Sequence, residues 1–129
     1  MAPISVTLAR RDPRAAVVAL FGEHDPYSSQ RLENVLSVLL DQQLAIVVDL
    51  RDTSFIDSTT LGVLLAGRTR AERAGLGFVL LLPQEKHAQV NHILDLTQLH
   101  RAFASVTSIE EGLRAARAGR ASRLPGKAA

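Results

Sequence analysis

From residue 45 onward, the chain alternates patterns typical of buried strands with patterns typical of helices. Residues 45–50 form a short apolar run rich in β-branched side chains, as in a strand buried on both faces of a sheet. A helical pattern begins after Ser58, a second buried strand is predicted over 77–83, and a further helix over 84–94. Such alternation predicts parallel strands joined by right-handed crossovers, with helices packed over the sheet.

The two ends of the chain complete this plan. Residues 4–8 and 15–21 read as two strands of an antiparallel hairpin, and a helix is predicted around residues 32–39. Residues 102–104 are predicted as a brief edge strand, and Ser108 begins a capping box before a last helix that ends near Gly119. We therefore predict a single α/β domain, with a mixed sheet of about five strands covered by about four helices.

Composition indicates one cytoplasmic domain. The length of 129 residues suits a single core, and the absence of cysteine excludes a disulfide scaffold. No apolar segment approaches the roughly 20 residues that cross a bilayer, so no membrane insertion is expected. The net charge of +2 depends on basic residues near the C-terminus. We expect the domain to occupy residues 1–117 and a basic, flexible tail to occupy residues 118–129.

Several classes of function are disfavoured by the sequence. The cations gather in the tail and aromatic residues are few, which argues against nucleic-acid binding. The four histidines lack the spacing of a zinc site, so no metal is expected. Residues 62–69 match the spacing of a phosphate-binding loop, with Arg68 in place of lysine, but they fall inside a predicted helix. No Gly-x-Ser-x-Gly elbow surrounds Ser58, so we expect no enzyme activity and no cofactor.

Two polar clusters precede predicted helices. Asp57, Ser58, Thr59 and Thr60 stand between a strand and a helix, where a hydroxyl either caps the helix or is available for modification. Residues 23–25, which are Glu23, His24 and Asp25, follow an earlier strand. They form either a recognition loop or a polar turn in which Asp25 caps the next helix.

These segments together resemble one known family. The stretch from Asp49 to Leu64, the Gly22-Glu23-x-Asp25 turn and the Gly75-x-Gly77 turn are similar to those of the STAS domain. The resemblance is strongest to the bacterial anti-sigma factor antagonists, and it spans residues 4–116.

The resemblance implies a mixed sheet covered by helices and a partner-switching function in transcription regulation. It implies that an anti-sigma factor serine kinase phosphorylates Ser58, with Thr59 as a minor alternative acceptor. The unphosphorylated protein would bind the anti-sigma factor and so release a sigma factor, phosphorylation would block that binding, and a separate phosphatase would restore it.

The residues assigned to partner binding are those of the two polar clusters, with Asp57 also orienting the Ser58 hydroxyl: Glu23, His24, Asp25, Asp57, Ser58, Thr59 and Thr60. STAS domains also serve as binding subunits of transporter ATPases and of stress-signalling complexes, where the serine need not be modified. That function is the alternative. The oligomeric state stays open.

Overall fold

The computed structural model of the chain describes residues 3–9 and 14–122. Its main feature is a five-stranded sheet with the strand order β1-β2-β4-β6-β7. The strands of this sheet are β1 (Ile4–Ala9), β2 (Ala15–Leu20), β4 (Ala45–Asp49), β6 (Phe78–Leu81) and β7 (Ala104–Val106). β1 and β2 form the predicted antiparallel hairpin, whereas the other neighbouring strands are parallel. The predicted mixed sheet is confirmed.

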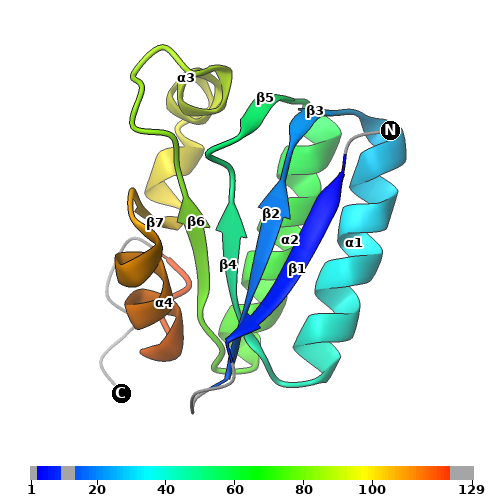
Figure 1. Cartoon of the computed structure of the whole chain (residues 1–129), viewed down its shortest axis with the longest axis vertical. Coiled ribbons are helices and arrows are strands. Elements are labelled where there is room, and N and C mark those ends of the chain that lie inside the picture. Colours follow the sequence, from blue (N-terminus) through cyan, green and yellow to red (C-terminus); the bar gives the residue numbers. More distant parts are fainter. Residues whose placement is uncertain (1–2, 10–13, 123–129) are drawn as a thin grey trace.

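The described residues form four α-helices, which lie over both faces of this sheet and beyond one of its ends (Figure 1). They are α1 (Pro26–Asp41), α2 (Ser58–Arg73), α3 (Gln89–Leu96) and α4 (Ile109–Arg117). Leu36 of α1, Leu64 of α2 and Leu94 of α3 belong to one buried cluster, while Ala115 and Ala116 of α4 belong to a second. Helices therefore bury both faces of β4 and β6, which explains why these strands are almost wholly apolar.

The sequence did not reveal a second, smaller sheet. β3 (Gly22–His24) and β5 (Thr53–Ile56) run parallel as a separate pair beyond the end of the main sheet (Figure 1). Each is too short and too polar to give a strand pattern, and the two are joined only by long-range pairing. Because α1 follows β3 and α2 follows β5, this small sheet sets the relative positions of the two helix starts.

Other boundaries differ from prediction for local reasons. α3 begins at Gln89 rather than at 84, because the side-chain amide of Asn91 donates to the carbonyls of Pro83 and Glu85, both at 2.8 Å, and holds the preceding segment in a loop. β7 begins at Ala104 rather than at 102, because a 3-10 turn (Leu99–Arg101) precedes it.

At the C-terminus, the packed body extends past residue 117. The Phe78 amide donates to the Arg120 carbonyl at 2.8 Å, and Ala121 is 5% exposed. The rest of the expected tail, from residue 123, lies outside the described residues. Within the part of the chain that the structure describes, no helix is long and apolar enough to cross a bilayer.

Candidate functional site

The start of α2 is built around the carboxylate of Asp57. Asp57 has an extended backbone and is the N-cap of the helix. Its Oδ1 atom accepts the Thr60 amide at 2.8 Å and the Thr60 hydroxyl at 2.9 Å. The cap therefore satisfies one of the amides that have no partner within the helix.

The three hydroxyl residues after Asp57 occupy different environments. Ser58 and Thr59 are exposed, whereas Thr60 is buried and its hydroxyl lies 3.4 Å from the carbonyl of His24. Within residues 3–9 and 14–122, the Ser58 hydroxyl makes no hydrogen bond, and the Asp57 carboxylate accepts from Thr60 rather than from Ser58. The structure thus places two of the three hydroxyls at the surface and uses the third as an internal contact.

A second helix start lies beside the first. Asp25 is the N-cap of α1: its Oδ1 atom accepts the amides of Tyr27 and Ser28, both at 3.1 Å, and Ser28 Oγ accepts the Asp25 amide at 3.0 Å. The backbone hydrogen bond from Ser28, together with that from Tyr27, holds the pKa of Asp25 below its ordinary value. Asp25 is therefore negatively charged at neutral pH.

The register of the small sheet brings the two caps together. His24 of β3 is paired with Ile56 of β5, and the strands are parallel. The next residue along each strand is the N-cap of the following helix, Asp25 in one case and Asp57 in the other. Two helix N-termini, each carrying a carboxylate, therefore start side by side at one end of the molecule.

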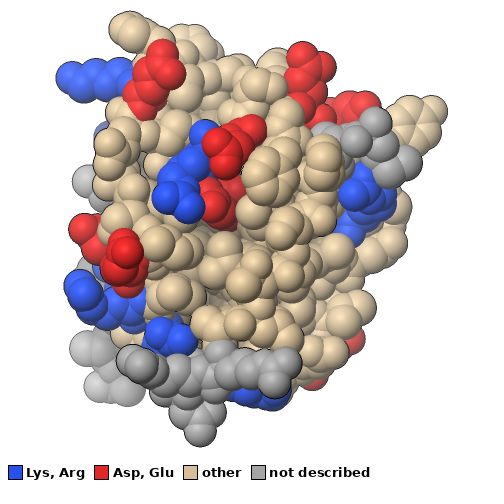
Figure 2. Space-filling view, viewed as in Figure 1, with Lys and Arg blue, Asp and Glu red and all other residues tan. Residues whose placement is uncertain are grey.

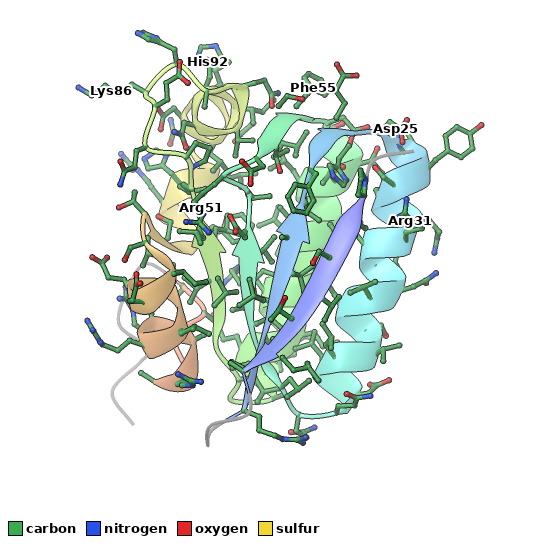
Figure 3. All side chains as sticks on the ribbon, in the orientation of Figure 1. Asp25, Arg31, Arg51, Phe55, Lys86 and His92 are labelled. Atoms are coloured by element: carbon green, nitrogen blue, oxygen red, sulfur yellow. The ribbon has the colours of Figure 1, made fainter. Side chains whose placement is uncertain are left out.

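Two exposed aromatic side chains belong to the same end, and sequence analysis did not assign them to the site. Tyr27 is 82% exposed near the start of α1, and Phe55 is 45% exposed on β5 opposite Glu23. Figure 3 shows Phe55 and Asp25 at this end of the molecule. The sequence signal that could have identified Phe55 is the alternation of side chains along a strand. Because Ile56 is buried, its neighbour Phe55 must point to the opposite, exposed face. Large exposed aromatic residues are frequent anchors in protein interfaces.

We define the candidate docking surface, called the docking surface below, as the exposed or half-buried residues at the two helix starts: Glu23, Asp25, Tyr27, Phe55, Asp57, Ser58 and Thr59. His24 and Thr60 differ from expectation, because their side chains are fully buried beneath this surface. Burial lowers the pKa of His24, although the Phe21 carbonyl and the carboxylates of Asp25 and Asp57 act in the opposite direction. A neutral imidazole there adds no positive charge to the docking surface.

Gln89 fixes α3 against the strand that leads into α2. Its Oε1 atom accepts the Ile56 amide at 2.9 Å, and its Nε2 atom donates to the Ile56 carbonyl at 3.0 Å. One side chain therefore satisfies both backbone groups of Ile56, as a neighbouring strand would. Gln89 and Ile56 are 33 residues apart, so no local pattern indicated this contact.

Gln89→Glu should destabilise the fold at pH 7 by about 1–3 kcal/mol, because the carboxylate has no proton to donate to the Ile56 carbonyl. At pH 5 the deficit should shrink, since burial favours protonation and the neutral acid can both donate and accept. Denaturant unfolding of the variant and the natural chain at both pH values measures this. Gln84→Glu, at an exposed position, is the matched control. An equal deficit at both pH values would contradict the role of the donated hydrogen bond.

Comparison with known proteins gives the family. A family model of the STAS domain matches residues 7–114. The chain belongs to the STAS domain family. No group of three or more His, Asp or Glu side chains in the described ranges is placed to hold a metal ion. The segment that matched a phosphate-binding loop lies within α2 of this STAS domain, where Gly67 is buried.

Solved structures with the same fold include anti-sigma factor antagonists. One, from Thermotoga maritima and assigned to these antagonists, is 26% identical, with a TM-score of 0.69, over 91% of this chain and 95% of that one. The unphosphorylated form of the anti-sigma factor antagonist SpoIIAA is 20% identical, with a TM-score of 0.68, over 87% of this chain and 94% of that one. The phosphorylated form of SpoIIAA, a Bacillus cell fate determinant, is 20% identical, with a TM-score of 0.62, over 85% of this chain and 97% of that one.

Proposed function

We propose that this STAS domain is an anti-sigma factor antagonist controlled by phosphorylation of Ser58. In its unphosphorylated form it binds an anti-sigma factor that is also a serine kinase, and the sigma factor held by that protein is released for transcription. Phosphorylation of Ser58 ends the binding, and a separate phosphatase restores it. The protein acts in the cytoplasm as a binding module without a cofactor.

The observation that carries this proposal is the exposed Ser58 hydroxyl at the first position of α2, without a hydrogen bond among the described residues. A kinase can reach such a hydroxyl without unfolding the domain. A helix N-terminus also accommodates a phosphate, because its free amides and the positive end of the helix dipole favour an anion. The fold should therefore survive the modification, and its effect should fall on the partner.

The environment of Ser58 supports an electrostatic mechanism. Asp25 and Glu23 are exposed and Asp57 is half-buried, so a docked partner already faces negative charge from three carboxylates. A phosphate adds about −1.5 to −2 further charges at neutral pH. A partner surface complementary to the hydroxyl form would have to cover this dianion without a counter-ion, which opposes binding.

The test is a phosphorylation assay with the anti-sigma factor kinases of the source organism and ATP, followed by mass spectrometry. We expect one phosphate on Ser58, none on Ser58→Ala, and normal incorporation into Thr59→Ala. Thr59 is the matched control, because it is an exposed hydroxyl one residue further along the same helix turn. Absence of phosphate from the natural chain, together with co-purification of transporter ATPase or stress-complex subunits, would support the alternative function instead.

A further inference from the structure

β1 has an open outer edge. It pairs with β2 on one side, and it stands at the end of the strand order with no other described strand beside it. The Phe21 amide donates to the Pro3 carbonyl, and Ile4 is paired with Leu20. In an antiparallel ladder this alternation directs the backbone groups of Ile4, Val6 and Leu8 away from β2. These groups are therefore free to pair with another strand.

This edge lacks the features that usually prevent strands of different molecules from pairing. Edge strands are commonly protected by charged residues, prolines or bulges. From Ile4 to Ala9 the chain has none of these, and the register with β2 is unbroken over all six residues. Val6 is 43% exposed and Leu8 is 48% exposed. Figure 2 shows the surface over the middle of β1 without acidic or basic side chains on the face in view.

The sequence of β1 is complementary to itself when two copies run antiparallel about a twofold axis at Val6. Val6 then faces Val6 of the second copy, and Ile4 faces Leu8. Ile4, Val6 and Leu8 all direct their backbone N–H and C=O groups away from β2. In each of these pairs, the N–H of either residue can therefore donate to the C=O of the other. Their side chains form one apolar row, while Ser5 faces Thr7 on the opposite side of the sheet, a favourable pairing of hydroxyls.

We propose that the chain forms a twofold homodimer in which two β1 strands pair antiparallel with Val6 at the axis. The dimer joins the two five-stranded sheets into one continuous sheet. The segment from Ile4 to Ala9 contains no charged residue, so pairing two copies of β1 brings no like charges together. This inference concerns an edge of the main sheet and does not depend on phosphorylation of Ser58.

Single-cysteine variants test the register, because the natural chain has no cysteine. In Val6→Cys the two opposed Cα atoms would lie about 5.5 Å apart, within the span of a disulfide. In Leu8→Cys each cysteine would face Ile4 of the second copy, so the two cysteines would lie four residues, or about 13 Å, apart along the strands. Under mild oxidation we expect Val6→Cys to cross-link at least about ten times faster than Leu8→Cys, although the two positions are similarly exposed. Equal rates would overturn the proposed register.

Sedimentation velocity tests the dimer itself. The natural chain should show a concentration-dependent dimer, and Val6→Lys should be monomeric because two like charges would face each other at the axis. Val38→Lys is the matched control, since Val38 is an exposed valine on α1 and its substitution should leave the dimer intact. Circular dichroism checks that all three chains are folded. A natural chain that stays monomeric up to about 1 mM would overturn the proposal.

Discussion

Ser58→Asp should weaken binding to the anti-sigma factor at least about tenfold, and phosphorylation of Ser58 should weaken it about 100-fold or more. Each factor of ten corresponds to about 1.4 kcal/mol, and like charges brought together in an interface cost several kcal/mol. The phosphate should have the larger effect because it carries about −1.5 to −2 charges whereas aspartate carries one. Ser58→Ala should bind constitutively and with nearly the natural affinity. Titration calorimetry with the purified partner measures all of these values.

Two controls separate repulsion from misfolding. Ser58→Asp should keep or slightly raise the thermal stability of the free domain, since an anion at a helix N-terminus contributes roughly 0.3–1 kcal/mol. Ser105→Asp adds the same charge at an exposed position on β7, at the far edge of the main sheet, and should leave the affinity unchanged. Equal affinities for Ser58→Ala and Ser58→Asp would contradict the electrostatic mechanism.

Ionic strength provides an independent test of the same mechanism. The Debye length falls from about 10 Å at 0.1 M salt to about 3 Å at 1 M. In this mechanism the partner is repelled by the carboxylates of Glu23, Asp25 and Asp57 and, in Ser58→Asp, by the added carboxylate as well. The ratio of the affinity of Ser58→Ala to that of Ser58→Asp should therefore shrink as salt is added. A ratio that does not respond to salt would indicate a steric effect of the longer side chain instead.

The strands and helices that sequence analysis predicted well are those with strong local patterns. β4 is apolar at four consecutive positions and β6 at all four of its positions, as expected for strands buried on both faces. Gly75, part of the Gly75-x-Gly77 turn, adopts a positive φ of 72° directly after the α2 C-cap at Ala74. At these positions a local signal and the packing in the fold agree.

The parts that the sequence did not reveal depend on contacts between distant segments. The pairing of β3 with β5 joins residues about 30 positions apart, and without it Asp25 and Asp57 cannot be placed together. Likewise, the burial of His24 follows from its place beneath both helix starts rather than from its polar neighbours. The candidate residues were therefore identifiable by type and motif, but their division into exposed contacts and buried supports needed the structure.

Gly77→Ala should be among the most destabilising single substitutions in the chain. Gly77 lies where the backbone before β6 passes against α4, and a Cβ atom there would lie 2.0 Å from the carbonyl oxygen of Ala116 and 2.6 Å from its Cα. The obstacle is backbone, so no rotamer change relieves it. The Gly77 carbonyl also accepts the Ile46 amide at 2.9 Å, which holds this segment to β4. We expect a loss of about 3 kcal/mol or more.

Thermal and denaturant unfolding measure this loss, and two other glycines calibrate it. At about 4 °C per kcal/mol, Gly77→Ala should lower Tm by more than about 10 °C. Gly62→Ala should instead stabilise the protein by about 0.5–1 kcal/mol, because Gly62 is exposed inside α2 and its Cβ would meet nothing within 4 Å. Gly67→Ala should fall between them, because its Cβ would lie 3.0 Å from a side-chain carbon of Phe78, which can move. A Gly77→Ala protein as stable as the natural chain would mean that α4 can shift away from β6 at little cost, and the close packing of that helix would then contribute little to the fold.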